Sequence, residues 1–287
     1  RARLVPPRVL IVAGSDSGGG AGIQADMKAC AALGVFSTTA IAALTAQNSQ
    51  GVQGIHPVPV EFVQQQMRSV LDDLGTDVVK TGMLATSEIV EGVAAALRAG
   101  APGPPAQLVL DPVMVSTSGH VLLQEDAIES VKAKMFPMAT VITPNLRETQ
   151  LLLGREDVHT LEAMERAARD LCAMGPRWAL VKGGHLRDVP PPGGASDAPA
   201  ATDVLCDGAS GRCLSFTSEF IETTHTHGTG CTLASSIAAF MARGLDVPAA
   251  VEEAKRYVSG AIAASAHLAL GTGKQGPMNH AWQTAEW

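Results

Sequence analysis

The sequence is poor in aromatic residues and has no cluster of basic ones. Only 3% of its 287 residues are aromatic, and the formal net charge is −7. Nucleic acids and anionic membranes bind clustered Lys and Arg, so we expect neither as a partner. No apolar run is long enough to span a bilayer, and no signal sequence is present. We expect a soluble intracellular protein of the cytoplasm or, in a plant or alga, of the plastid stroma.

Cysteine is scarce as well. The chain has five cysteines and no C-x-x-C spacing: Cys30, Cys172, Cys206, Cys213 and Cys231. An odd number without that spacing argues against a disulfide framework and against a zinc site. It favours a reducing compartment. The first residue is Arg1 rather than Met, so we expect a processed or excised fragment.

Short apolar runs alternate with amphipathic segments along most of the chain. The pattern predicts strands over residues 8–13, 38–44, 77–80, 108–110, 140–142 and 178–181. It predicts helices over residues 22–33, 60–74, 87–98, 126–135, 145–153 and 161–174. A hairpin (203–206 with 213–216) and two long helices (229–243 and 248–270) are expected to follow. This order predicts an α/β fold with a mainly parallel central sheet and helices on both faces.

No linker divides the chain and no internal repeat occurs in it. We therefore expect one domain over residues 1–287, with flexible tails at 1–7 and 275–287. Residues 185–201 are rich in Pro, Gly and Ala, which predicts a surface loop. The loop is either a flap near a nucleotide or an insertion without a role.

Polar side chains follow the predicted strands at the points where these end. They include carboxylates, amides and two lysines: Ser15, Asp16, Gln47, Asn48, Lys80, Thr81, Asp111, Thr143, Asn145 and Lys182. Parallel α/β sheets bind ligands beyond the carboxyl ends of their strands. Two glycine-rich segments join this edge, and the combination predicts a cleft that handles phosphate groups.

The first glycine-rich segment, residues 14–22 (GSDSGGGAG), closes a strand and opens a helix. Its glycines allow backbone N–H groups to approach an anion or a flat ring closely. It matches neither the P-loop nor the dinucleotide-binding pattern, and taken alone it also suits a plain flexible turn.

The second segment, residues 227–232 (HGTGCT), precedes an apolar helix. Successive N–H groups at a helix N-terminus form an anion hole that can stabilise a phosphoryl group in transfer. The same field favours the thiolate of Cys231. The alternative is a plain Gly/Thr helix start with a buried cysteine.

Two further patterns suit phosphate chemistry. Asn145 and Glu148 are three residues apart at a helix start, where they suit Mg²⁺ held mostly through water. A simple N-cap pair is the alternative. Lys182 precedes two glycines and can reach an ATP phosphate; the alternative is an edge lysine that extends into solvent.

Together these residues resemble the ribokinase-like superfamily and, within it, the hydroxymethylpyrimidine and phosphomethylpyrimidine kinases. The resemblance covers residues 9–270 and rests on segments in matching order: 13–16, 21–26, 46–48, 80–84, 111–114, 143–145, 182–185 and 226–232. Residues 77–84 and 111–122 look like the kinase half of the plant enzyme that continues into a thiamin-phosphate synthase. These 287 residues hold no such second domain, and fusion to one in a longer parent chain is left open.

The resemblance implies ATP-dependent phosphorylation of 4-amino-5-hydroxymethyl-2-methylpyrimidine and then of its monophosphate, in thiamin biosynthesis. It implies that the aminopyrimidine is bound by Asp26 and Gln47, in a pocket lined by Gly14, Met83 and Val113. It implies that Mg–ATP is held by Asp111, Thr143, Asn145, Lys182 and Thr229, with the metal ion at Asp111 and Glu148. The catalytic group would be Gly228, Gly230 and Cys231. Small molecules are the expected partners of a homodimer, and a monovalent cation as a further cofactor is left open.

One departure separates this chain from the sugar kinases of the superfamily. They carry an aspartate base where this chain has Cys231, whereas the pyrimidine kinases and some pyridoxal kinases carry cysteine. A pyridoxal kinase is therefore the alternative, although segments 46–48 and 80–84 favour the pyrimidine. A non-catalytic pyrimidine sensor is a further alternative, which the presence of Lys182 and Glu148 argues against.

Overall fold

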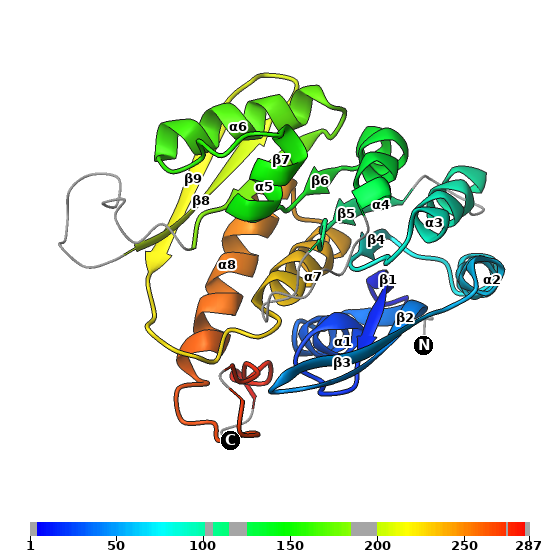
Figure 1. Ribbon diagram of the computed structural model, residues 1–287, viewed down its shortest axis with the longest axis horizontal. Coiled ribbons are helices and arrows are strands. Elements are labelled where there is room, and N and C mark those ends of the chain that lie inside the picture. Colours follow the sequence, from blue (N-terminus) through cyan, green and yellow to red (C-terminus); the bar gives the residue numbers. More distant parts are fainter. Residues whose placement is uncertain (1–4, 101–105, 115–124, 185–199, 274, 285–287) are drawn as a thin grey trace.

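The computed structural model describes residues 5–100, 106–114, 125–184, 200–273 and 275–284. Its centre is a nine-stranded sheet in the order β3-β2-β1-β4-β5-β6-β7-β8-β9 (Figure 1). Six strands are parallel: β1 (Arg8–Asp16), β2 (Phe36–Asn48), β4 (Val78–Thr81), β5 (Gln107–Leu110), β6 (Val141–Ile142) and β7 (Trp178–Lys182). The edges are antiparallel: β3 (Gly51–Pro57), β8 (Ala200–Asp207) and β9 (Cys213–Glu219). The predicted mainly parallel α/β sheet is confirmed.

Helices cover both faces of this sheet (Figure 1). One face carries α1 (Gly22–Ala32), α7 (Thr229–Ala242) and α8 (Val247–Ala263). The other carries α2 (Val60–Leu71), α3 (Ser87–Ala99), α4 (Glu125–Ser130), α6 (Leu161–Ala173) and, beside α6, α5 (Leu146–Leu153). In β1, Val9 and Ile11 face the first core, and Leu10 and Val12 face the second. Burial on both faces is the reason why this strand is apolar without alternation.

Several boundaries differ from the sequence prediction. The antiparallel strand β3 was not predicted, because its sequence GVQGIHP has a glycine in its middle and little apolar alternation. The last helix ends at Ala263 rather than at residue 270, and residues 200 and 201 begin β8 instead of ending a loop. Residues 185–199 of the predicted loop lie outside the described residues.

The expected flexible tail from residue 275 onward is wrong for the described residues 275–284. Met278, Asn279 and His280 are at most 2% exposed. The Tyr257 hydroxyl donates a hydrogen bond to the His280 carbonyl at 2.6 Å. This segment therefore packs against α8 and α7 as part of the domain.

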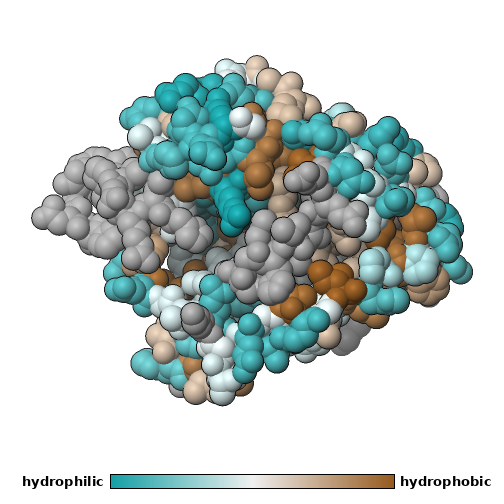
Figure 2. Space-filling model, in the orientation of Figure 1, coloured by the Kyte–Doolittle hydropathy of each residue, from teal (hydrophilic) through white to brown (hydrophobic). Residues whose placement is uncertain are grey.

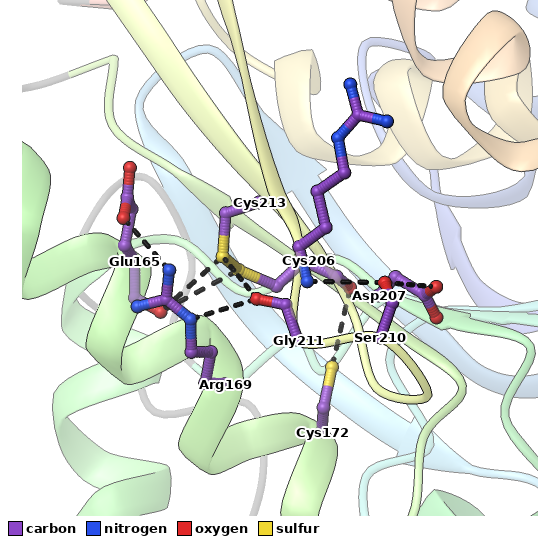
Figure 3. Close-up of a disulfide and its surroundings, with 9 residues drawn as sticks. Glu165, Arg169, Cys172, Cys206, Asp207, Ser210, Gly211 and Cys213 are labelled. Carbon is purple, nitrogen blue, oxygen red and sulfur yellow. Dashed lines mark hydrogen bonds and ion pairs between the residues drawn. A yellow bond between two sulfur atoms is a disulfide. The ribbon is translucent and has the colours of Figure 1, made fainter.

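One disulfide joins Cys206 in β8 to Cys213 in β9, contrary to the expectation from the cysteine count (Figure 3). The two cysteines are paired directly across the antiparallel strands, with their Cα atoms 4.1 Å apart. The sequence spacing of seven matches no redox or zinc motif, so no pattern in the sequence indicated this pair. Cys30, Cys172 and Cys231 are free.

Among the described residues, no helix is both long enough and apolar enough to cross a membrane. Exposed apolar side chains such as Phe62, Leu74 and Leu151 lie on different parts of the surface. In Figure 2 the brown patches of this face are separate and bordered by hydrophilic residues.

Candidate active site

The strand order places a crevice at the carboxyl ends of β1 and β4. β1 connects to β2 on one side, whereas β4, β5, β6 and β7 follow in turn on the other side. Ligands of open parallel sheets bind at such a reversal of strand order. The glycine-rich segment after β1 and the N-terminus of α7 meet at this place.

Gly20 and Gly228 bring these two segments into direct contact. Gly228 has φ +83°, and a Cβ on it would collide with the Gly20 carbonyl. A Cβ on Gly20 would in turn lie 2.6 Å from Cδ2 of His227. Only glycine allows this approach, which fixes the α7 N-terminus against the end of β1.

On one side of the contact lies a charged group of side chains, called the Lys182 cluster: Asp111, Thr143, Glu148 and Lys182. The Lys182 ammonium lies 3.2 Å from Asp111 Oδ1, which also accepts a 3.0 Å bond from the Thr143 hydroxyl. A Cβ on Gly230 would lie 3.3 Å from Lys182 Nζ and 3.8 Å from Asp111 Oδ2. The first turn of α7 therefore faces this cluster.

Glu148 is buried in the same cluster and caps α5. Its carboxylate accepts the Asn145 N–H at 2.8 Å, while the Asn145 amide oxygen accepts the Glu148 N–H at 2.9 Å. The N-cap interpretation is thus confirmed as local structure. Burial raises the pKa of Glu148 to about 7, Lys182 opposes the rise, and Asp111 adds to it. A second carboxylate this close to Asp111 makes a cation favourable here.

On the other side lies a hydrogen-bonded group called the Gln47 cluster: Asp16, Thr45, Gln47 and His227. Nε2 of His227 is 3.0 Å from Asp16 Oδ2 and 3.1 Å from the amide of Gln47. Asp16 also accepts the N–H groups of Gly18, Gly20 and Ala21. Burial opposes its charge, but bonds from His227 and the backbone outweigh burial and lower the pKa of Asp16.

An apolar wall adjoins the carboxyl ends of β1 and β4. Ala43, Met83 and Ala85 form a small buried group with Val113 packed against it. A Cβ on Gly14 would collide with the Met83 side chain. Gly14, Met83 and Val113, which the resemblance placed together, are thus brought together by the structure.

Asp26 has a different environment from the one expected of a pocket residue. Both oxygens of its carboxylate accept bonds from Lys80 at 2.9 Å, and Oδ1 accepts the Ser235 hydroxyl at 2.7 Å. Asp26 and Lys80 are 0% exposed. Burial would lower the pKa of Lys80, but the Asp26 carboxylate outweighs it and raises that pKa. The described contacts make Asp26 a support beneath α7, and contact with a substrate stays a prediction.

Cys231 is half-buried in the first turn of α7. Burial raises the pKa of its thiol to about 11, with Lys80 opposing the rise and Asp26 and Asp111 adding to it. The expectation that the helix terminus favours its thiolate is therefore wrong. The Thr229 hydroxyl donates to the Thr226 carbonyl at 2.5 Å, which holds the turn.

Sequence reasoning assigned no role to His227 and only placed Asp16 at the end of a strand. The signal for both was present, since each belongs to a glycine-rich segment. Their pairing across 211 positions could not be deduced from spacing. A small cavity of about 20 Å³ opens beside them, lined by Gln47, Asn48, Ser49, Gly51, His227 and Gln275. A cavity of about 380 Å³ lies between α2 and α3, at the amino ends of the strands and away from these groups.

The sequence matches the phosphomethylpyrimidine kinase family over residues 16–279. A hydroxymethylpyrimidine/phosphomethylpyrimidine kinase of Streptomyces coelicolor is 50% identical over 284 residues, which are 99% of this chain and 97% of that protein. The chain belongs to this family. It is also 48% identical to the chloroplastic thiamine biosynthetic bifunctional enzyme of Arabidopsis thaliana, covering 96% of this chain and half of that protein. The resemblance to the kinase half of the plant enzyme is confirmed.

Solved structures confirm the ribokinase-like fold of this family member. The phosphomethylpyrimidine kinase of Clostridium difficile has a TM-score of 0.74 at 33% identity, covering 89% of this chain and 99% of its own. The Staphylococcus aureus pyridoxal kinase in complex with AMP-PCP and pyridoxal has a TM-score of 0.81 at 29% identity, covering 96% and 94%. Kinases of two flat nitrogen heterocycles thus share this fold.

Proposed function

We propose that the protein transfers the γ-phosphoryl group of ATP to the 5-hydroxymethyl oxygen of 4-amino-5-hydroxymethyl-2-methylpyrimidine. A second transfer onto the resulting monophosphate gives the diphosphate used in thiamin biosynthesis. The observation that carries this proposal is the position of the α7 N-terminus. Its first turn lies between the charged Lys182 cluster and the neutral amide of Gln47.

The Lys182 cluster is assigned to the phosphates. Burial would lower the pKa of Lys182, but Asp111 and Glu148 outweigh it, so the ammonium keeps its charge. The N–H groups of the Gly228–Cys231 turn face the same space, where the positive end of the α7 dipole stabilises added negative charge. In-line transfer of a phosphoryl group from one oxygen to another depends mainly on such positioning and charge stabilisation.

The cluster also fits a magnesium ion. Mg²⁺ prefers hard oxygen donors and retains several waters. Asp111, Thr143 and Glu148 of the cluster supply oxygen donors, as does Asn145 at the adjoining N-cap of α5. The described residues contain no group of three or more His, Cys, Asp and Glu that would enclose a metal by itself. Two carboxylates that share the ion with water and phosphate match that pattern. Bound Mg²⁺ would neutralise phosphate charge.

The first transfer forms a bond between the substrate oxygen and the γ-phosphorus, breaks the bond to ADP, and passes the hydroxyl proton to a transferred phosphoryl oxygen or to water. With a pKa of about 11, the Cys231 thiol keeps its own proton at neutral pH and is a poor acceptor. We therefore assign the catalytic contribution of this turn to its backbone N–H groups. The thiol is assigned to packing.

The pyrimidine is assigned to the apolar wall of Met83 and Val113, with its amino edge at Gln47. An assay of ADP release with the pyrimidine, its monophosphate and pyridoxal tests this assignment. We expect turnover of both pyrimidines and a kcat/KM for pyridoxal that is lower by about 5- to 150-fold, because a mismatched polar edge costs about 1–3 kcal/mol. Preference for pyridoxal would contradict the proposal.

Gln47→Leu provides the residue-level test of the pyrimidine assignment. It removes the amide that hydrogen-bonds to the pyrimidine ring, so kcat/KM for the pyrimidine should fall by about 5- to 150-fold. The KM for ATP should stay unchanged. Gln64→Leu is the matched control, because that glutamine lies between α2 and α3 and donates to the Gly92 carbonyl. An unchanged kcat/KM in Gln47→Leu would remove this residue from the pocket.

A further inference from the structure

The amide of Gln47 has two polar neighbours that decide which way it points. The amide oxygen is placed 3.2 Å from the Thr45 hydroxyl, and the amide nitrogen is placed 3.1 Å from Nε2 of His227. The oxygen and nitrogen of an amide have nearly the same shape, so their assignment follows from the hydrogen-bond network. Both neighbours have further partners that fix what each can offer.

The first constraint comes from Thr45. Its hydroxyl lies 2.9 Å from the Ser15 carbonyl, which can only accept. A hydroxyl has a single proton to donate. The Ser15 carbonyl is nearer than the Gln47 amide, so we assign the proton to that carbonyl, and the Thr45 oxygen has only lone pairs left for Gln47. On this assignment the –NH₂ group of Gln47 faces Thr45, which exchanges the two amide atoms relative to their placed positions.

The second constraint comes from Asp16. Hydrogen bonds from the backbone N–H groups of Gly18, Gly20 and Ala21 keep the Asp16 carboxylate ionised, so it can only accept. Nε2 of His227 lies 3.0 Å from that carboxylate and must carry a proton. The atom of Gln47 that faces the same N–H must then be the amide oxygen. Two independent neighbours thus require the same orientation.

We propose that Asp16, through His227, and Thr45 lock the Gln47 amide with its oxygen toward His227 and its –NH₂ toward Thr45. Asp16 and His227 are positioning residues, since they act on the substrate through Gln47. The backbone of Gln47 is held as well, because its N–H donates to the Ser17 hydroxyl at 2.8 Å and its carbonyl accepts from that hydroxyl at 2.7 Å.

An amide locked in this way favours one arrangement of donor and acceptor on the substrate edge over the reversed arrangement. This specificity rests on the proposed function. The amide has one N–H proton and one oxygen lone pair left over, side by side. They match a ring nitrogen beside an amino group, which is the edge of a 4-aminopyrimidine. The 4-oxo analogue presents an N–H beside a carbonyl, and a fixed amide cannot turn to meet that reversed pattern.

The decisive measurement is the tautomer of His227 in the wild-type enzyme. Protein labelled with ¹⁵N-histidine gives ring nitrogen signals, and those lost in His227→Gln identify residue 227. We expect the proton on Nε2. A neutral ring with its proton on Nδ1 would reverse the amide and overturn the proposal. This readout does not depend on turnover, so it stands even if the enzyme phosphorylates neither pyrimidine, a result that would contradict only the proposed function.

The second measurement compares kcat/KM for the 4-amino substrate with that for the 4-oxo analogue. His227→Leu removes the lock on one side and Thr45→Val on the other, so each should narrow the wild-type ratio by about tenfold, as one hydrogen bond would. His227→Gln, whose amide can still donate to Asp16, should restore part of the ratio. A loss of activity toward both compounds with an unchanged ratio would indicate a merely structural role and would overturn the proposal.

Discussion

The Lys182 cluster and the Gln47 cluster lie on opposite sides of the α7 N-terminus, and different forces hold them. In the first, an ammonium group lies close to two buried carboxylates, so each charge depends on the others. In the second, one carboxylate fixes the side chains of His227 and Gln47 through directional hydrogen bonds. Electrostatic attraction tolerates small displacements, whereas a hydrogen-bonded amide distinguishes a donor from an acceptor. Binding of phosphate groups requires an attraction that tolerates small displacements. Recognition of one particular heterocycle requires hydrogen bonds that distinguish a donor from an acceptor.

Substitution of Gly228 should disrupt both clusters at once and gives the largest expected effect. Gly228→Ala adds a Cβ that collides with the Gly20 carbonyl, in a backbone conformation that L-residues rarely adopt. We expect kcat/KM to fall by about 10³-fold or more, because the anion hole shifts relative to both clusters.

The matched control is Gly34→Ala. Gly34 has φ +73°, and a Cβ added to it would meet no atom within 4 Å. This variant should lose about 1–2 kcal/mol of stability through the same backbone strain and keep its activity. Thermal unfolding and steady-state kinetics of both variants separate strain from collision. Equal activity losses would refute a special role for the Gly20–Gly228 contact.

Lys182→Met should damage the Lys182 cluster and spare the other. The variant keeps the length of the side chain but removes the charge near Asp111 and Glu148. We expect kcat to fall by roughly 10²- to 10³-fold, as for other donors to transition-state charge. Isothermal titration should show unchanged affinity for the pyrimidine. Lys132→Met, which breaks only an exposed pair with Glu129, is the control and should have normal kinetics.

Cys231→Ala tests whether the turn works through its backbone or its thiol. With the thiol protonated, kcat should stay within about tenfold of the wild type, whereas loss of a general base costs about 10²–10⁴-fold. Alkylation of Cys231 by iodoacetamide should be slow at pH 7 and accelerate as the pH approaches the pKa of about 11. Fast alkylation at pH 7 together with a large loss of kcat would restore the thiolate as the base.

Glu148→Gln should have the smallest effect on activity, and the size of its effect on stability depends on pH. The folded-state pKa of Glu148 is about 7, above its ordinary 4.5, so its contribution to stability is present below pH 4.5 and lost as the pH rises through 7. The variant avoids this loss and should melt on the order of 5 °C above the wild type at pH 8, and at the same temperature at pH 4.5. Added Mg²⁺ should stabilise the wild type more than the variant.

The exposed residue Glu91, inside α3, provides the control for this comparison. Glu91→Gln should change the melting temperature little at either pH, because a surface substitution alters stability by about 0.5 kcal/mol or less. If Glu148→Gln has the same melting curve as the wild type at both pH values and the same response to Mg²⁺, Glu148 is only the cap of α5.

Much of this site was predicted from the polar residues that follow the strands, because the carboxyl ends of parallel strands meet at one edge. Asp111, Thr143 and Lys182 follow different strands and were expected together on that ground, and they share hydrogen bonds. The position of a residue after a strand does not tell which way its side chain faces. Lys80 was counted at this edge, yet it points into the face covered by α7 and pairs with Asp26.

The remaining misses arise from contacts that are distant in sequence or from burial. The edge strand β3 lacks an apolar pattern because most of its residues are exposed. The packing of residues 275–284 depends on Tyr257 and Thr232, which lie on helices far from them in the sequence. Burial raises the pKa of Cys231, and a sequence motif does not report burial.

The contact between Gly20 and Gly228 also bears on when the enzyme becomes active during its own synthesis. β1 and its glycine-rich segment leave the ribosome early, whereas α7 follows the last strand of the sheet. The hydrogen bond between Asp16 and His227 can form only after the chain has been extended by 211 positions. A nascent chain that has reached β9 holds the residues of the sheet but lacks an anion hole. We therefore expect catalysis to begin only after translation has passed α7, and we expect chains truncated before α7 to be inactive even when their strands have paired.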